Sequence, residues 1–131
     1  MKILYLEDDK MLSEIFQTAV MSYDPEMDIE HFVNGEKALD YIKANLDDIA
    51  AIVLDIRVTG ALTGLEVAQA TRELGYSGPM FISSAYRKPE KSFLEKYGCE
   101  WMAKPWQIMD VALRIVPLVR VQRQLSTTHN T

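Results

Sequence analysis

Short apolar runs of strand length recur along the chain, at residues 2–6, 27–32, 51–54, 79–83 and 101–103. Runs of this kind, bounded by polar and turn-forming residues, are typical of β-strands. The third and fourth runs contain the continuous apolar stretches AIVL and MFI, which predict strands buried on both faces. The second run, MDIEHF, alternates between apolar and polar residues, so it is predicted to lie at the edge of a sheet.

Segments with helical spacing follow the runs. Their apolar residues recur three and four positions apart within residues 12–19, 38–42, 65–74, 93–97 and 108–119. The fourth segment has Pro89 near its start and Gly98 at its end, residues that favour the first turn and the termination of a helix. Pro117 falls inside the last segment and predicts that this helix kinks or ends there, because its ring clashes with the carbonyl of Leu113.

Strands that alternate with helices over 131 residues predict a single α/β domain. The expected architecture is a doubly wound, five-stranded parallel sheet with helices flanking both faces. We expect the domain to span residues 1–121. Residues 122–131, which end in the polar stretch STTHNT, are expected to form a disordered C-terminal tail.

Composition excludes several classes of function. Apolar residues make up 48% of the chain and charged residues 25%, close to the average of soluble globular domains. The net charge of -5 has the wrong sign for a domain that binds nucleic acid by itself. No stretch is long enough for a signal peptide or a membrane span, and Cys99 has no second cysteine to pair with. These features predict a cytoplasmic protein in which Cys99 is a buried apolar residue.

Charged and hydroxyl side chains follow the ends of four predicted strands. They are Glu7, Asp8 and Asp9 after the first strand, Asp55 after the third, Ser84 after the fourth and Lys104 after the fifth. The carboxyl ends of parallel strands meet at one edge of the sheet, where ligands bind. Carboxylates about 4 Å apart repel by roughly 4 kcal/mol at an effective dielectric near 20, so the acids predict a bound Mg²⁺. A lysine and a hydroxyl suit a phosphoryl group, which makes Asp55 the natural acceptor.

Each of these residues also has a purely structural interpretation. Asp8 and Asp9 would serve equally well as caps of the first helix. Ser84 could be an ordinary turn residue, Lys104 a surface lysine and Trp101 part of the core. His31 lacks a second metal ligand at a suitable spacing and is assigned no role. Three arginines near the chain end are interpreted as a solvated set that complements a helix dipole: Arg114, Arg120 and Arg123.

The sequence resembles the receiver domains of the two-component response-regulator family over essentially its whole length. The resemblance rests on four motifs that occur in order, YLEDDK, IVLDIRVTG, FISSAY and WMAKPW. It implies a flavodoxin-like (βα)5 fold with strand order 2-1-3-4-5. It also implies that Asp55 is phosphorylated, that Ser84 and Lys104 sense the phosphoryl group, and that Trp101 is a switch residue.

The resemblance implies a metal site and two residues that control the lifetime of the phosphorylated state. Mg²⁺ is expected on Glu7, Asp8, Asp55 and the main-chain carbonyl of Arg57. Arg57 and Tyr86 stand two residues after the acceptor and the hydroxyl, where they flank the phosphoryl group. Neither is a carboxylate or an amide that could orient a water, so slow hydrolysis is expected.

Several positions depart from the family pattern. Thr59 stands where proline is common, and the segment from Asp55 to Gly64 is one residue longer than the commonest spacing. Both features predict a different shape for the loop after Asp55. Ser84 replaces the more usual threonine, and Trp101 is bulkier than the usual tyrosine or phenylalanine.

These features favour a signalling phosphoacceptor, rather than an enzyme with external substrates. The resemblance implies a histidine kinase or a histidine phosphotransfer protein as donor and Mg²⁺ as cofactor. A downstream protein is expected on the surface of the fourth helix, fifth strand and fifth helix, which includes Tyr86, Trp101 and Val111. A homodimer is a further possibility, and the chain either acts alone or is part of a longer regulator or hybrid kinase.

Two alternatives belong to other classes. A HAD-like aspartate-nucleophile phosphohydrolase also places an aspartate after a strand, in a D-x-D arrangement. Here Arg57 occupies the position of the second acid, so the proton donor for turnover is missing. The other alternative is a receiver-like interaction module that phosphorylation does not control. The intact set of Asp8, Asp55, Ser84 and Lys104 argues against it.

Overall fold

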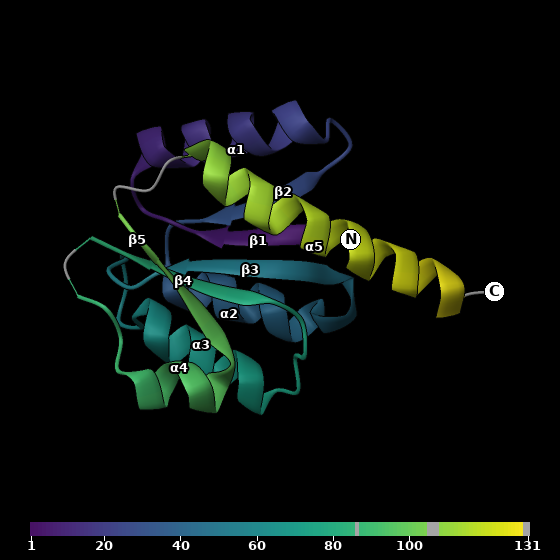
Figure 1. Ribbon diagram of the computed structural model, residues 1–131. Helices are drawn as coiled ribbons and strands as arrows, with labels where there is room; N and C mark the ends of the chain where they lie inside the picture. Colours follow the sequence, from purple (N-terminus) through teal and green to yellow (C-terminus); the bar gives the residue numbers. More distant parts are fainter. Residues whose placement is uncertain (86, 105–107, 130–131) are drawn as a thin grey trace.

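The computed structural model describes residues 1–85, 87–104 and 108–129 (Figure 1). Its strands are β1 (Lys2–Leu6), β2 (Asp28–Phe32), β3 (Ile49–Asp55), β4 (Met80–Ser84) and β5 (Cys99–Ala103). Its helices are α1 (Lys10–Tyr23), α2 (Gly35–Ala44), η1 (Leu46–Asp48, a 3₁₀ turn), α3 (Gly64–Glu73), α4 (Lys91–Tyr97) and α5 (Ile108–His129). The predicted alternation of strands and helices is therefore confirmed.

The five described strands form one parallel sheet in the order β2-β1-β3-β4-β5. This order confirms the doubly wound architecture and places β2 at an edge, as its alternating pattern predicts. Every residue of the central strand β3 is buried, whereas β2 has no fully buried residue. The sequence pattern thus distinguished the edge strand β2 from the central strand β3.

The helices cover both faces of the sheet (Figure 1). α1 and α5 pack on one face, over an apolar cluster that includes Tyr5, Phe16 and Phe81. α2, α3 and α4 lie on the other, over a second cluster that includes Leu54 and Ile82. β3 contributes residues to both clusters, so its continuous apolar run fills two cores at once.

The ends of α4 differ slightly from the prediction. Gly98 adopts a φ of 60°, a left-handed conformation that ends the helix as expected. Pro89 precedes the helix rather than opening it, because Glu90 has an extended ψ of 143° and acts as the N-cap. Cys99 follows directly and is buried, as predicted, and burial raises the pKa of its thiol.

α5 does not end at Pro117, so of the two predicted outcomes, a kink or an end, the end is wrong. Leu113 is 52% exposed and Pro117 is also exposed. The Leu113 carbonyl, which loses its hydrogen-bond donor because proline has no N–H, therefore lies on the solvent side of the helix. The helix also continues past the predicted domain boundary, so residues 122–129 are helical in the structure. The extent of the domain itself stays a prediction.

The arginines of α5 make specific contacts beyond a dipole interaction. Arg114 pairs with Glu100 of β5 at 2.8 Å. Arg120 donates to the carbonyl of Tyr23 at 3.1 Å and lies 3.5 Å from Asp24, so it binds the C-terminal end of α1. The side chain of Arg123 lies outside the described part of the structure.

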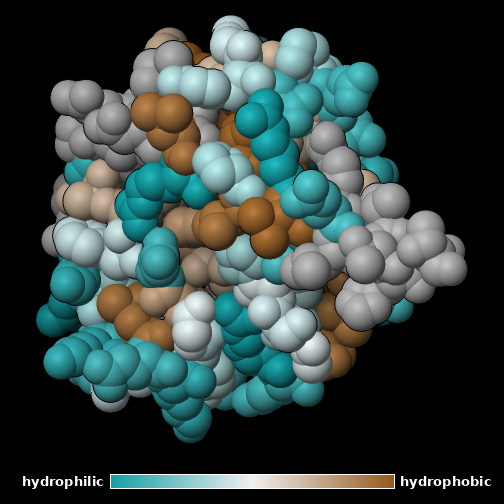
Figure 2. Space-filling view, turned by 45° about the vertical axis from the view of Figure 1, so that its right-hand side comes forward, coloured by the Kyte–Doolittle hydropathy of each residue, from teal (hydrophilic) through white to brown (hydrophobic). Residues whose placement is uncertain are grey.

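Some large apolar side chains remain at the surface. They include Met11, Ile15 and Met21 of α1 and Leu113, Leu118 and Val121 of α5. Figure 2 shows apolar side chains in several groups with polar ones between them on the face that it presents. Within the described ranges, no helix combines the length and apolar character that crossing a membrane requires.

Candidate functional site

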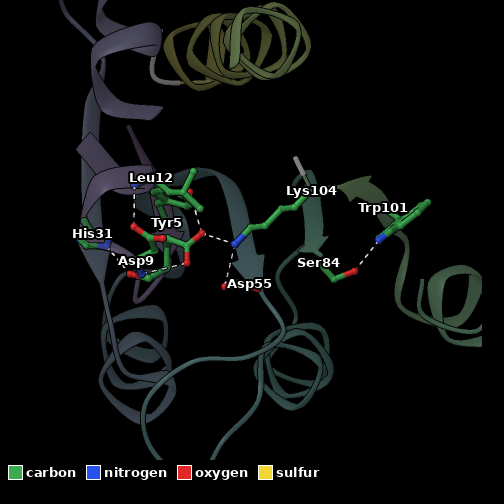
Figure 3. A network of polar contacts seen from close by, with 9 residues as sticks. Tyr5, Asp9, Leu12, His31, Asp55, Ser84, Trp101 and Lys104 are labelled. Atoms are coloured by element: carbon green, nitrogen blue, oxygen red, sulfur yellow. Dashed lines mark hydrogen bonds and ion pairs between the residues drawn. The ribbon is translucent and has the colours of Figure 1, made fainter. Parts of the chain in front are cut away.

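The carboxyl ends of four strands surround one cleft of about 410 Å³. Its lining includes the predicted site residues Glu7, Asp8, Asp55, Arg57, Ser84 and Lys104. Trp101 joins them through a hydrogen bond to Ser84 (Figure 3). Tyr86 and the side chain of Val111 lie outside the described part of the structure.

Parallel register places these residues together. Asp55 of β3 pairs with Ser83 of β4, and Ser84 pairs with Ala103 of β5. Lys104 therefore follows directly beside Ser84, and its amide donates to the Ser84 carbonyl at 2.8 Å. Because all strands run in one direction, residues far apart in sequence are brought to the same edge of the sheet.

Lys104 is the cation that offsets the clustered acids. Its Nζ lies 2.5 Å from Glu7 Oε1 and 3.0 Å from Asp55 Oδ2 (Figure 3). Glu7 is only 1% exposed, and burial, reinforced by the nearby Asp55, raises its pKa. Burial by itself lowers the pKa of Lys104, but the hydrogen bonds with Glu7 and Asp55 outweigh it and raise the pKa above its ordinary value. Lys104 is therefore charged at neutral pH.

Glu7, Asp8 and Asp55 form a cluster that can hold a metal ion. One oxygen from each carboxylate can be chosen so that all three lie within 4.8 Å of one another. Glu7 and Asp55 are buried, whereas Asp8 is exposed and open to an incoming ion. An all-oxygen donor set with one accessible carboxylate suits Mg²⁺, which retains waters when it binds. The main-chain carbonyl of Arg57 stays a predicted ligand.

Helix capping and metal binding, the two interpretations of the acids after β1, apply to different residues. Asp9 caps α1, because its side chain accepts from the amide of Leu12 at 3.1 Å. The Asp9 amide in turn donates to Glu7 Oε2 at 3.2 Å. Asp8 instead belongs to the acidic cluster that can hold a metal ion, so the helix cap and this cluster share one short turn.

Two neighbours of Glu7 were not assigned from the sequence. His31 Nε2 lies 2.7 Å from the Glu7 main-chain oxygen, and the Tyr5 hydroxyl lies 3.5 Å from Glu7 Oε1. Tyr5 and His31 are paired across β1 and β2. The contact of His31 is with a main-chain atom, and no sequence motif records a contact of this kind.

The loop after Asp55 is held at two points. Gly64 opens α3 against the Asp55 main chain, where an added Cβ would collide with the Asp55 carbonyl oxygen. Glu36 of α2 accepts from the amides of Ala61 at 2.6 Å and Leu62 at 2.8 Å. The loop between β3 and α3 is thus hydrogen-bonded to the N-terminal end of α2.

The Ser84 hydroxyl has two partners in the structure. Its Oγ donates to the main-chain oxygen of Arg87 at 2.7 Å and accepts from Trp101 Nε1 at 2.9 Å. Figure 3 shows the hydroxyl directed toward Trp101 and away from Asp55. Arg87 also lines the cleft, a position that no motif indicated.

Known proteins show the same architecture. The receiver domain of the Francisella response regulator 1452 superposes with a TM-score of 0.77 at 26% identity, covering 91% of this chain and 96% of that one. The fold is therefore that of a response-regulator receiver domain. A CheY-like receiver domain protein from Methanospirillum hungatei matches with a TM-score of 0.75 at 17% identity, over 94% of this chain and 96% of that one.

The receiver resemblance extends to a curated sequence. Response regulator RppA from Synechocystis is 25% identical over 122 residues, which are 92% of this chain and 51% of RppA. The chain thus spans about half the length of the curated relative that it matches. No family model matches the sequence. The resemblance inferred from the four motifs is confirmed by the fold and by this relative.

Proposed function

We propose that the chain is a phosphoacceptor receiver domain that takes a phosphoryl group on Asp55 and changes conformation in response. One observation carries this proposal. Asp55 ends a buried strand in a cleft where an acidic cluster and Lys104 meet it, with Lys104 Nζ at 3.0 Å. A carboxylate in this setting is accessible to a small anion and adjacent to the positive charge that such an anion needs. The role is that of a signalling protein rather than of a dedicated enzyme.

The transfer joins an Asp55 carboxylate oxygen to phosphorus. The bond between phosphorus and the donor's imidazole nitrogen breaks, and its electron pair stays on that nitrogen. Lys104 is positioned to pair with a phosphoryl oxygen in place of one of its present carboxylate partners. Ser84 supplies a hydroxyl donor once it turns toward Asp55.

Glu7, Asp8 and Asp55, together with the Arg57 carbonyl, are the proposed Mg²⁺ ligands. Bound there, the ion supplies positive charge that offsets the phosphoryl oxygens. Glu7 keeps Lys104 close to the acceptor, and Asp8 offers the exposed carboxylate of the cluster. Phosphohydrolase turnover lacks support, because Arg57 lines the cleft where the second acid of a D-x-D motif is required.

The donor is proposed to be a histidine kinase or a histidine phosphotransfer protein. The response is proposed to pass through Ser84 and Trp101 to the surface of α4, β5 and α5, where a downstream protein or a second copy binds. Ser84 and Trp101 lie on adjacent strands, β4 and β5, and share a hydrogen bond, which supports this route.

The test is phosphorylation with acetyl phosphate and Mg²⁺, followed by intact-mass measurement. The wild type should gain the mass of one phosphoryl group, and Asp55→Asn should gain none. Asp40→Asn, which changes an exposed aspartate of α2, is the matched control and should be labelled like the wild type. Equal labelling of Asp55→Asn and the wild type would refute the assignment of Asp55.

A further inference from the structure

The single hydrogen of the Ser84 hydroxyl is already committed. Ser84 is 6% exposed, and its Oγ donates to the Arg87 carbonyl at 2.7 Å. A serine hydroxyl has only one hydrogen to donate, so it cannot at the same time donate to a phosphoryl oxygen on Asp55. The orientation in Figure 3, away from Asp55, agrees with this commitment.

Trp101 completes the arrangement from the other side. Its indole N–H donates to the same Oγ at 2.9 Å, and Trp101 lies opposite Ile82 in the pairing of β4 with β5. Lys88 Nζ lies 5.3 Å from the centroid of the Trp101 ring, a cation–π contact that restrains the half-buried indole. Residues of the segment between β4 and α4 therefore hold both the hydroxyl and its indole partner.

We propose that the Trp101 indole and the Arg87 carbonyl form a hydrogen-bonded latch that withholds the Ser84 hydroxyl from Asp55 in the resting state. This inference rests on the proposed phosphoacceptor function and concerns regulation of the same site. Switching then requires Ser84 to leave the Arg87 carbonyl and the Trp101 N–H before it can donate to a phosphoryl oxygen. Because the indole of Trp101 supplies the N–H, the latch requires a hydrogen-bond donor at residue 101 and not only an aromatic ring.

The change of hydrogen-bond partners at Ser84 contributes only a small free energy in favour of the phosphorylated state. Ser84 gives up two neutral hydrogen bonds and gains one to a charged acceptor, which is the stronger kind. Trp101 is half-buried and Arg87 is exposed, so solvent can reach the released groups. The net contribution of one neutral hydrogen bond corresponds to about a two- to twelvefold change in an equilibrium constant. Removing the indole N–H should therefore shift activation by a factor in this range.

The experiment measures beryllofluoride binding in Mg²⁺ by calorimetry, supported by fluorine NMR of the bound species. Trp101→Phe keeps an aromatic ring but removes the N–H donor, so it should bind beryllofluoride about two- to twelvefold more tightly than the wild type. Ser84→Ala should bind more weakly. In the Ser84→Ala background, Trp101→Phe should produce no further change, because the latch acts only through the hydroxyl.

The outcomes separate the latch from the proposed function. Equal affinities of Trp101→Phe and the wild type would overturn the latch, as would a gain that persists in the Ser84→Ala background. Tyr97→Phe, which removes a hydroxyl from an aromatic residue of neighbouring α4, is the matched control. A similar gain in beryllofluoride affinity for this variant would also overturn the latch. If the wild type binds no beryllofluoride, the phosphoacceptor function itself is refuted. Circular dichroism and thermal unfolding establish that each variant is folded.

Discussion

Lys104 partly offsets the negative charge of the acidic cluster before any ligand arrives. Its Nζ lies within 3.0 Å of both Glu7 and Asp55, which are buried, and its own side chain is largely covered. The repulsion expected from the clustered acids is therefore offset by a residue from the opposite end of the chain. Removing that one cation would leave two buried carboxylates without compensation.

We predict that Lys104→Met lowers the free energy of unfolding by about 3 kcal/mol when divalent cations are absent. Mg²⁺ should stabilise the variant more than the wild type, because the ion no longer competes with the lysine for the same carboxylates. Urea unfolding in EDTA and in Mg²⁺ measures both effects. Lys43→Met, at an exposed position of α2, is the control and should unfold like the wild type. If Lys104→Met were as stable as the wild type in EDTA, Lys104 would not be needed to offset the buried carboxylates.

Arg57 lines the cleft two residues after the acceptor. We predict that Arg57→Asn shortens the lifetime of the phosphorylated state up to about fivefold, the effect of losing a partly exposed charge pair. The guanidinium can pair with phosphoryl oxygens, whereas an asparagine amide can orient an attacking water. The loss of phosphate after donor removal measures the lifetime. Arg114→Asn, remote from the cleft, should leave the lifetime unchanged, and an equal lifetime for Arg57→Asn would exclude the shielding role.

At the scale of elements, the loop between β3 and α3 is held by a helix that precedes it in the chain. Glu36, in the first turn of α2, accepts from the amides of Ala61 and Leu62, and the Gly35 amide donates to the Thr59 carbonyl at 3.4 Å. Gly60 adopts a φ of 104° between these contacts, a conformation that favours glycine. The loop that begins at Asp55 is thus fixed in place by α2.

The contribution of Glu36 should depend on pH. Hydrogen bonds from its own backbone amide and from those of Leu62 and Ala61 hold the pKa of Glu36 below the ordinary 4.5. A lowered pKa in the folded state means that the stabilisation is present above the unfolded-state pKa and is lost as the pH falls through the folded-state value. We predict that Glu36→Gln melts at a lower temperature than the wild type at pH 7. The gap should narrow as the pH falls below 4.5, and a gap that is constant between pH 7 and pH 3 would contradict the ionic role.

At the scale of the whole molecule, Arg72 joins segments that are separate in sequence. From α3 its guanidinium donates to the carbonyls of Tyr76 and Gly78 at 2.9 and 2.8 Å, and to those of Tyr97 and Gly98 at 2.6 and 2.9 Å. These carbonyls belong to the turn before β4 and to the end of α4. Arg72 therefore ties α3 to both connections at the edge of the sheet opposite the cleft.

We predict that Arg72→Lys lowers the free energy of unfolding by about 2 kcal/mol. A lysine ammonium cannot reproduce the planar set of donors, so some of the four carbonyls lose their partner. Urea unfolding of Arg72→Lys beside Arg114→Lys, which alters an exposed arginine, measures the difference. A change below about 0.5 kcal/mol for Arg72→Lys would mean that solvent replaces the guanidinium without cost.

The sequence by itself determined the alternation of strands and helices, the edge position of β2 and the strand ends on which the site is built. Burial leaves a period of two or of about 3.6 residues in a strand or a helix, and this signal is local. The carboxyl ends of parallel strands must share one edge, so Asp8, Asp55 and Lys104 could be placed together from their positions alone. The strand order 2-1-3-4-5 required the family resemblance, because periodicity does not record which strands are neighbours.

Only the tertiary structure decided which way the side chains point and which distant groups they meet. Asp9 caps α1 while its neighbour Asp8 joins the acidic cluster, a division that depends on the path of one turn. Ser84 turns toward Trp101, and Glu36 reaches a loop 25 residues further along the chain. α5 continues through Pro117 because its inner face packs against the sheet while the proline lies on the exposed side. Such outcomes depend on packing between segments that are far apart in sequence, which no local pattern encodes.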